Sequence, residues 1–173
     1  MTRPATRAYV GVGANVGDRL AALRAAVEAL DGRADTAVVA ASPVYETEAL
    51  VPPGAPAQPD HLNAVLALDT ALAPLALLRT LRAAERAAGR DHAAPRWSPR
   101  PLDLDVLVYG PRRLAGPTLT VPHPELAARR FVLRPFADLA PDLVVPGLGR
   151  TVAELLAATP DRSRLAPTAL RLR

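Results

Sequence analysis

Asp103 and Asp105 stand two residues apart in an otherwise apolar segment, 102–109, that we predict to be a β-strand. Because side chains alternate across a strand, both carboxylates face the same side, roughly 6–7 Å apart along it. Two carboxylates this close repel each other, so a divalent cation or an arginine has to compensate their charge. The spacing leaves two interpretations open: a magnesium site that receives substrate phosphates, or an edge strand whose aspartates pair with Arg96 or Arg100.

The segment before this strand carries three arginines, Arg90, Arg96 and Arg100, and the only tryptophan of the chain, Trp97. Arginines beside a carboxylate pair are suited to a polyphosphate held between metal and guanidinium groups. Their place in a predicted loop favours a lid that closes over a substrate. The alternative is an exposed basic loop with its tryptophan packed on the core.

Other side chains could contact a ligand. Asn63 lies in a predicted strand, 61–70, on the face opposite its apolar residues, where its amide could read the edge of a heterocycle or cap a turn. His123, between two prolines, could contact a phosphate or bond within its own loop. Four of the six aromatic residues could either wall a flat ligand or belong to the core: Tyr9, Tyr45, Trp97 and Phe131.

Hydrophobic periodicity and turn residues predict the elements that position these side chains. The predicted strands are 8–12, 36–45, 61–70 and 102–109, and the predicted helices are 19–30 and 75–88, with shorter ones after Pro124, near 134–139 and at 152–158. Asp18 is expected to cap the first helix, and the four prolines of 50–59 indicate a loop. The order strand, helix, strand, strand, helix, strand (βαββαβ) is the split βαβ arrangement, which predicts an α+β sandwich with an antiparallel four-stranded core sheet flanked by helices.

The composition narrows the class of protein. The 173 residues predict a single domain, with a core over about 7–158 and a loosely held tail after Asp161. The chain has no lysine, which excludes the usual P-loop NTPase, and no cysteine, which excludes disulfides and thiolate metal sites. With neither a signal peptide nor a transmembrane stretch in the sequence, we expect a cytoplasmic protein.

Five stretches occur in the order and spacing of a known family. They are Gly-Ala-Asn at 13–15, Ser-Pro-Val-Tyr-Glu-Thr at 42–47, Gln-Pro-Asp-His-Leu-Asn at 58–63, Arg-Trp-Ser-Pro-Arg-Pro-Leu-Asp-Leu-Asp at 96–105 and Val-Pro-His-Pro at 121–124. Through them the chain resembles the 6-hydroxymethyl-7,8-dihydropterin pyrophosphokinases over roughly residues 7–156.

The resemblance implies a ferredoxin-like α/β sandwich and a reaction. ATP gives its β,γ-diphosphoryl group to the hydroxymethyl oxygen of the pterin and AMP leaves, a step of tetrahydrofolate biosynthesis. It also implies that Asp103 and Asp105 hold two Mg²⁺ ions. The implied phosphate contacts are Arg90, Arg96, Arg100, His123 and Arg129. The implied nucleotide side is completed by Leu78, Arg82, Glu85, His92, Trp97, Val106 and Thr120. The implied pterin contacts are Thr47, Leu50, His61, Asn63 and Phe131.

Three features depart from the family pattern. His61 stands where the family usually has a tyrosine or phenylalanine that stacks on the pterin. His92 stands near an arginine of some members, and the loop 51–58 is about three residues longer than in shorter members.

Two further classes of function fit the sequence less well. Ferredoxin-like folds also bind RNA, but these strands are poor in the aromatic residues that stack on bases, and the basic residues are scattered. An inactive scaffold or sensor would not need the intact aspartates and arginines. We therefore expect a monomeric enzyme that binds ATP and the pterin, but no nucleic acid and no membrane.

Overall fold

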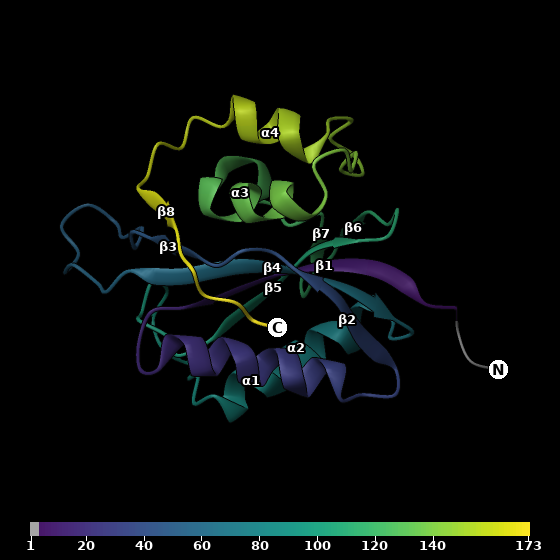
Figure 1. The fold of residues 1–173 in the computed structure, drawn as a ribbon, viewed down its shortest axis with the longest axis horizontal. Coiled ribbons are helices and arrows are strands. Elements are labelled where there is room, and N and C mark those ends of the chain that lie inside the picture. Colours follow the sequence, from purple (N-terminus) through teal and green to yellow (C-terminus); the bar gives the residue numbers. More distant parts are fainter. Residues whose placement is uncertain (1–3) are drawn as a thin grey trace.

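A six-stranded antiparallel sheet lies between two layers of helices in the computed structural model, which describes residues 4–173 (Figure 1). The strands are β1 (Thr6–Ala14), β2 (Thr36–Ala41), β3 (Tyr45–Thr47), β4 (His61–Thr70), β5 (Asp103–Tyr109), β6 (Leu114–Ala115), β7 (Thr120–Val121) and β8 (Leu165–Pro167). The helices are α1 (Arg19–Asp31), α2 (Pro74–Ala87), the 3₁₀-helix η1 (Leu126–Ala128), α3 (Arg130–Leu139) and α4 (Val152–Ala158). Strands β6 and β7 form a separate ribbon.

The strand order of the main sheet confirms the predicted fold. The order is β5-β1-β4-β3-β8, and β2 also pairs with β4, so that β5, β1, β4 and β2 form the four-stranded antiparallel core of a ferredoxin-like fold. Helices α1 and α2 cover one face of this core, and α3 and α4 cover the other (Figure 1).

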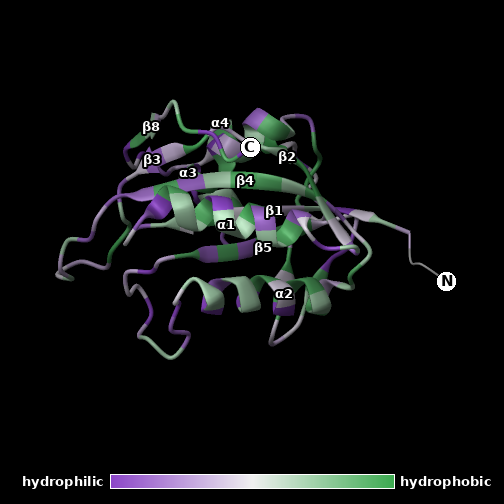
Figure 2. Ribbon diagram, turned by 60° about the horizontal axis from the view of Figure 1, so that its bottom comes forward, coloured by the Kyte–Doolittle hydropathy of each residue, from purple (hydrophilic) through white to green (hydrophobic). Residues whose placement is uncertain are grey.

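Alternating apolar side chains of the strands fill two clusters, one on each face of the sheet. In β4, Leu66 and Leu68 pack toward α1 and α2, whereas Val65 packs toward α3 beside Leu107 and Phe136. Each helix turns one apolar side toward the sheet. Along α2, hydrophobic (green) and hydrophilic (purple) segments alternate (Figure 2). Each such buried side chain contributes roughly 1.5–3 kcal/mol, so the sheet is a firm base for the site.

The predicted strand 36–45 is wrong as a single element, because β2 ends at Ala41 and β3 begins at Tyr45. Pro43 has no N–H to offer a ladder. Ser42 bonds to β4 at this break. Its N–H donates to the carbonyl oxygen of Val65 at 2.9 Å, and its Oγ accepts from the Val65 N–H at 2.9 Å. After this break β3 pairs with the first three residues of β4.

The prediction of a loosely held tail after Asp161 is also wrong. Strand β8 pairs with β3, and Leu172 is only 6% exposed within the core cluster below the sheet. The guanidinium of Arg24 donates to the carbonyl oxygen of Arg171 at 2.9 and 3.0 Å. Short edge strands of this kind leave little trace in the local pattern, since their partners lie far away in the sequence.

Within residues 4–173, the helices are all too short or too polar to cross a bilayer.

Candidate active site

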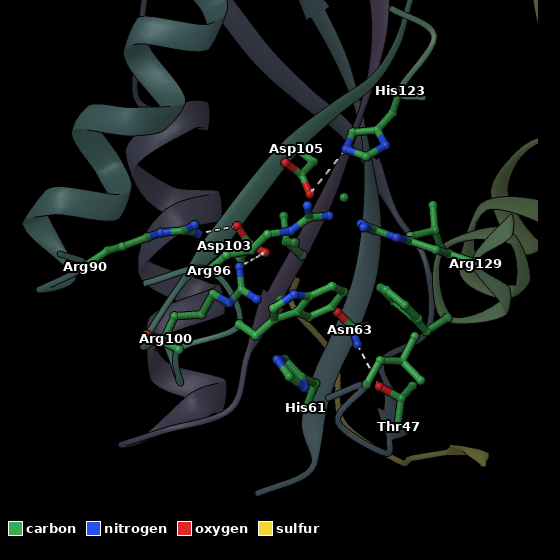
Figure 3. A pocket seen from close by; sticks show the side chains of 18 of the residues that line it. Thr47, His61, Asn63, Arg90, Arg96, Arg100, Asp103, Asp105, His123 and Arg129 are labelled. Carbon is green, nitrogen blue, oxygen red and sulfur yellow. Dashed lines mark hydrogen bonds and ion pairs between the residues drawn. The ribbon is translucent and has the colours of Figure 1, made fainter. Parts of the chain in front are cut away.

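A cavity of about 360 Å³ opens on the face of the sheet that α3 and α4 cover (Figure 3). Strands β1, β4 and β5 form its floor, the loops 48–60 and 88–102 its rim, and the start of α3 one wall. Most of the residues predicted for the site line it: Thr47, Leu50, His61, Asn63, Arg90, His92, Arg96, Trp97, Arg100, Asp103, Asp105, His123, Arg129 and Phe131. The sheet thus brings together residues that are up to 84 positions apart in the chain.

The floor of the cavity consists of two rows of paired residues. Gly13 of β1 lies between Asn63 of β4 and Asp103 of β5, and one row further along Gly11 lies opposite Asp105. Both carboxylates therefore project from the same face of β5, as the alternation of the strand predicts. The two glycines keep the floor between them free of side chains.

Gly13 has a steric reason to be glycine. A Cβ atom at this position would lie 2.5 Å from Oδ1 of Asn63, closer than real contacts allow. At Gly11 the nearest atom to a Cβ would be 3.5 Å away, on Leu107, which is an ordinary van der Waals contact. Gly13 thus leaves room for the Asn63 amide, a role that the sequence pattern alone did not reveal.

Asp103 is paired with two arginines. Arg90 bonds its Oδ1, and the Arg100 Nη1 donates to its Oδ2 at 3.1 Å (Figure 3). The pairing of Asp103 with Arg100 agrees with the second interpretation of the sequence, in which the aspartates pair with arginines. The cavity nevertheless remains open, and Arg96 lies instead over the Trp97 ring, its guanidinium carbon 5.0 Å from the ring centroid.

Asp105 faces His123, whose Nε2 is 3.9 Å from Oδ2 of the aspartate (Figure 3). Burial, and then the negative charge of Asp103, raise the pKa of Asp105 to about 7. The Glu125 N–H donates to Nδ1 of His123 at 3.1 Å, which leaves Nε2 to carry the proton of the neutral ring. Burial, and then the charge of Arg129, lower the pKa of His123.

Glu85 joins Arg90 to His92 at one side of the site. It is only 4% exposed, and its Oε1 accepts from Nη1 of Arg90 at 3.0 Å and from the Leu104 N–H at 2.8 Å. Its Oε2 is 2.6 Å from Nε2 of His92. A carboxylate buried with this many partners acts as an anchor.

A second, shallower cavity adjoins this group. It is lined by Leu78, Arg82, Glu85, Arg86, Arg90, His92, Asp103, Leu104 and Asp105. Val106 and Thr120 are not among the described residues lining either cavity. Val106 is 3% exposed in the core on the opposite face of β5, where the alternation that exposes Asp105 places it, and Thr120 lies in the β6–β7 ribbon.

The end of the first cavity beside β3 and β4 is suited to a flat heterocycle. Asn63 donates from Nδ2 to Oγ1 of buried Thr47 at 2.8 Å, which orients the amide toward the cavity. Phe131 lies at the start of α3 with the Arg129 guanidinium 5.8 Å from its ring centroid. Of the four aromatic candidates, Trp97 and Phe131 line the cavity, whereas Tyr9 packs on Phe136 in the core and Tyr45 bonds to Asp138.

Asn15 was not predicted to have a role, although it connects the loops around the cavity. It is 1% exposed, and its Oδ1 accepts from the Arg100 N–H at 2.8 Å. Its Nδ2 donates to Oε1 of Gln58 at 3.2 Å and to the Pro59 carbonyl at 3.3 Å. Gln58 in turn bonds the Trp97 carbonyl. The available signal was an asparagine in the turn after a buried strand, a place that favours bonds to neighbouring backbone.

His61 is held in its neutral form. Burial, and then the positive charge of Arg100, lower the pKa of His61 to about 4. The ring lines the cavity beside the rim of the loop 48–60. An uncharged imidazole at this position is able to lie against a heterocycle without carrying a charge into the cavity.

Lowering the pH should therefore destabilise the wild-type protein more than it destabilises a His61→Phe variant. Between the ordinary histidine pKa near 6.5 and the folded-state pKa of about 4, the unfolded chain binds a proton that the folded chain excludes. Stability falls as the pH drops through this window, by about 1–2 kcal/mol for this group between pH 7 and pH 5. Urea unfolding of both proteins at the two pH values measures the difference, and equal losses would refute the assignment to His61.

The residues fit a divalent cation. Asp103 and Asp105 offer carboxylate oxygens on one face, and a cation would relieve the repulsion from Asp103 that, after burial, raises the pKa of Asp105. No cluster of three or more acidic or histidine ligands occurs among residues 4–173. Two carboxylates plus ligand phosphates are the donor set that Mg²⁺ favours.

An α+β sheet that carries paired carboxylates and arginines around a cavity is the arrangement expected of a small enzyme that acts on a polyphosphate substrate. A family model described as 7,8-dihydro-6-hydroxymethylpterin-pyrophosphokinase (HPPK) matches residues 9–141. The chain belongs to this family.

Two curated relatives carry the name 2-amino-4-hydroxy-6-hydroxymethyldihydropteridine pyrophosphokinase. The protein of Pseudomonas aeruginosa is 47% identical over 154 residues, which is 89% of this chain and 92% of the relative. The protein of Synechocystis is 42% identical over 149 residues, which is 86% of this chain and 74% of the relative.

Solved structures show the same fold. A chain titled HPPK-DHPS in complex with substrates matches 90% of this chain with a TM-score of 0.69 and 11% identity. A Plasmodium falciparum HPPK-DHPS matches 90% with a TM-score of 0.68 and 12% identity. This chain spans 43% and 45% of the length of those two chains.

Proposed function

We propose that this protein transfers the diphosphoryl group of ATP to the hydroxymethyl group of 6-hydroxymethyl-7,8-dihydropterin and releases AMP, in the biosynthesis of folate. The observation that carries the proposal is the pair Asp103 and Asp105 on the floor of an open cavity in a chain of this family. The site requires no second chain, because β1, β4, β5 and α3 supply its floor and wall, and the protein acts as a monomer.

The carboxylates of Asp103 and Asp105 would hold two Mg²⁺ ions together with oxygens of the triphosphate. When bound, these ions neutralise phosphate charge and draw electron density from the phosphorus that is attacked. Asp103 already has two cationic partners, so Arg90 and Arg100 would turn from the carboxylate toward the phosphates. Arg100 has a spare donor for this, because its buried Nε has no hydrogen-bond partner among the described residues.

The nucleotide would lie across the junction of the two cavities. Leu78 and Arg82 of α2 border the shallower one and would contact the adenosine, with Glu85 and His92 beside them. The arginines of the rim, with His123 and Arg129 opposite, would surround the triphosphate. Bidentate guanidinium contacts suit phosphate oxygens, and none of them needs a lysine.

The pterin would occupy the other end of the first cavity. The Asn63 amide and the backbone near Thr47 and Leu50 would read its hydrogen-bonding edge. Phe131 and His61 would flank its two faces. The hydroxymethyl oxygen then attacks the β-phosphorus: a new O–P bond forms, the bond from the β-phosphorus to the oxygen that bridges it to the α-phosphate breaks, and AMP leaves with that oxygen.

Positioning and electrostatics supply most of the acceleration in this mechanism. Asp105 is the base nearest to the cavity floor that could take the hydroxyl proton, since its side chain is 43% exposed there. His123 presents its Nε2 side to the same carboxylate and would contact the transferred phosphates.

The test is to incubate the protein with ATP, Mg²⁺ and the reduced hydroxymethylpterin, and to separate the nucleotides by ion-exchange chromatography. We expect AMP and the pterin diphosphate in equal amounts. ADP as the product would instead identify an ordinary kinase and would refute the proposed reaction.

A further inference from the structure

The C-terminal segment forms the outer wall behind the pterin end of the cavity. Leu165 of β8 pairs with Thr47 of β3, and Thr47 pairs on its other side with His61 of β4. Thr47 also accepts the hydrogen bond that orients the Asn63 amide. The position of Thr47, and with it that of Asn63, therefore depends on a strand from the end of the chain.

One residue of this segment contacts both ends of the loop 48–60. The Arg164 N–H donates to Oε1 of Glu48 at 2.6 Å, and the Arg164 carbonyl accepts from the Glu48 N–H at 3.2 Å. At the other end of the loop, Nη2 of Arg164 donates to Oδ2 of Asp60 at 2.5 Å. Arg164 thus links residues 12 positions apart and closes the base of the loop.

The loop has few regular bonds of its own. It contains four prolines, which cannot donate backbone hydrogen bonds, and it forms no helix or strand. Yet Leu50 lines the cavity, Gln58 bonds the opposite rim, and Asp60 immediately precedes His61. Fixing the two ends of such a loop limits the positions that its middle can reach.

We propose that Arg164 is a positioning residue for the pterin end of the site, acting through the loop 48–60. The inference rests on the proposed function for its ligand, but its structural part is independent of that function. The ion pair is a surface one, with side-chain exposures of 56% for Arg164 and 32% for Asp60, so it contributes little to overall stability. The ion pair instead influences the local order of the loop and the affinity for the ligand that the loop helps to bind.

An Arg164→Ala variant removes the link to Asp60 and keeps the backbone bonds to Glu48. We expect the KM for the pterin to rise about fivefold, with kcat and the KM for ATP unchanged. Amide hydrogen exchange in residues 49–59, measured without substrates, should become faster. Arg164→Lys, which keeps the charge, should restore part of the pterin affinity, and the defect of Arg164→Ala should shrink in high salt as the wild-type ion pair is screened.

Arg171→Ala is the matched control. Arg171 is another exposed arginine of the same segment, and its guanidinium bonds only the neighbouring Leu170 carbonyl among the described contacts. This variant should leave both the pterin KM and the exchange of residues 49–59 unchanged. A lower melting temperature of Arg164→Ala with unaltered exchange and KM, or an equal effect of both variants, would overturn the proposal. If Arg164→Ala makes exchange faster but the wild-type protein forms no AMP, only the proposed function is refuted.

Discussion

Asp105→Asn will abolish diphosphoryl transfer and leave the fold intact. Asparagine has the same shape but no charge, so the variant loses a ligand for the cation and the candidate base at the floor of the cavity. We expect kcat to fall by at least about a thousandfold, the effect of several kcal/mol of lost stabilisation in the transition state. The stability should stay level or rise, because both causes that raise the pKa of Asp105, burial of the charge and then repulsion from Asp103, disappear with the charge.

AMP formation and thermal unfolding measure these two effects. Asp69→Asn is the control, because Asp69 is also a strand aspartate but lies at the end of β4 away from the cavity, where it pairs with Arg7. It should retain full turnover. Near-normal turnover of Asp105→Asn, or clear destabilisation by it, would favour a structural role and refute the metal assignment.

Gly13→Ala will weaken pterin binding strongly and spare ATP binding. The new Cβ would lie 2.5 Å from Oδ1 of Asn63, so the amide has to leave the position that its bond to Thr47 defines. Displacing a partly buried amide forfeits hydrogen bonds worth about 1–3 kcal/mol, which corresponds to a roughly tenfold to hundredfold loss of pterin affinity. Titration calorimetry with the pterin and, separately, with ATP measures the split.

Gly11→Ala provides the comparison within the same strand and on the same floor. Its Cβ would meet Leu107 at 3.5 Å, an ordinary contact, so the pterin affinity should change little. If the two substitutions weaken the pterin equally, the close approach to Asn63 is not the cause. If Gly13→Ala binds the pterin normally, Asn63 does not read its edge.

Much of the fold follows from local signals. Helix α4 has the predicted bounds 152–158, and Asp18 caps α1 by accepting from the Ala21 N–H at 3.0 Å. The alternation in β4 assigned Leu66 and Val65 to opposite faces, and both lie where it placed them. These features succeed because helical periodicity, capping and strand alternation are set by residues close together in the chain.

The errors have a common physical origin in pairing at a distance. The break at Pro43 depends on what β4 offers alongside it, and β8 is a three-residue strand that exists because β3 has a free edge. The prediction that α3 begins near residue 134 missed the Asp161 carboxylate, which accepts from the Arg130 N–H at 2.7 Å and fixes the first turn.

The features of the site fall into the same two groups: those that local patterns indicate and those that depend on contacts between distant segments. The paired carboxylates and the arginine loop were evident from spacing, and Asn63, His123 and Phe131 were candidates from their residue types and positions. The family resemblance supplied the other predicted lining residues. The connections between them were not evident: Glu85 joins Arg90 to His92, and Asn15 joins two loops that are far apart in sequence. Such contacts depend on the three-dimensional packing of loops, for which no short pattern exists.

The docking of the tail has a consequence for the order in which the molecule is completed. Arg164 and Arg171 bond residues 116 and 147 positions earlier in the chain. During synthesis, β1, β4 and β5 can pair before residues 164–173 leave the ribosome, but β3 then still has an unpaired edge. The part of the cavity floor formed by β1 and β5 can therefore form while the nascent chain is growing, whereas the part beside β3 depends on residues 164–173.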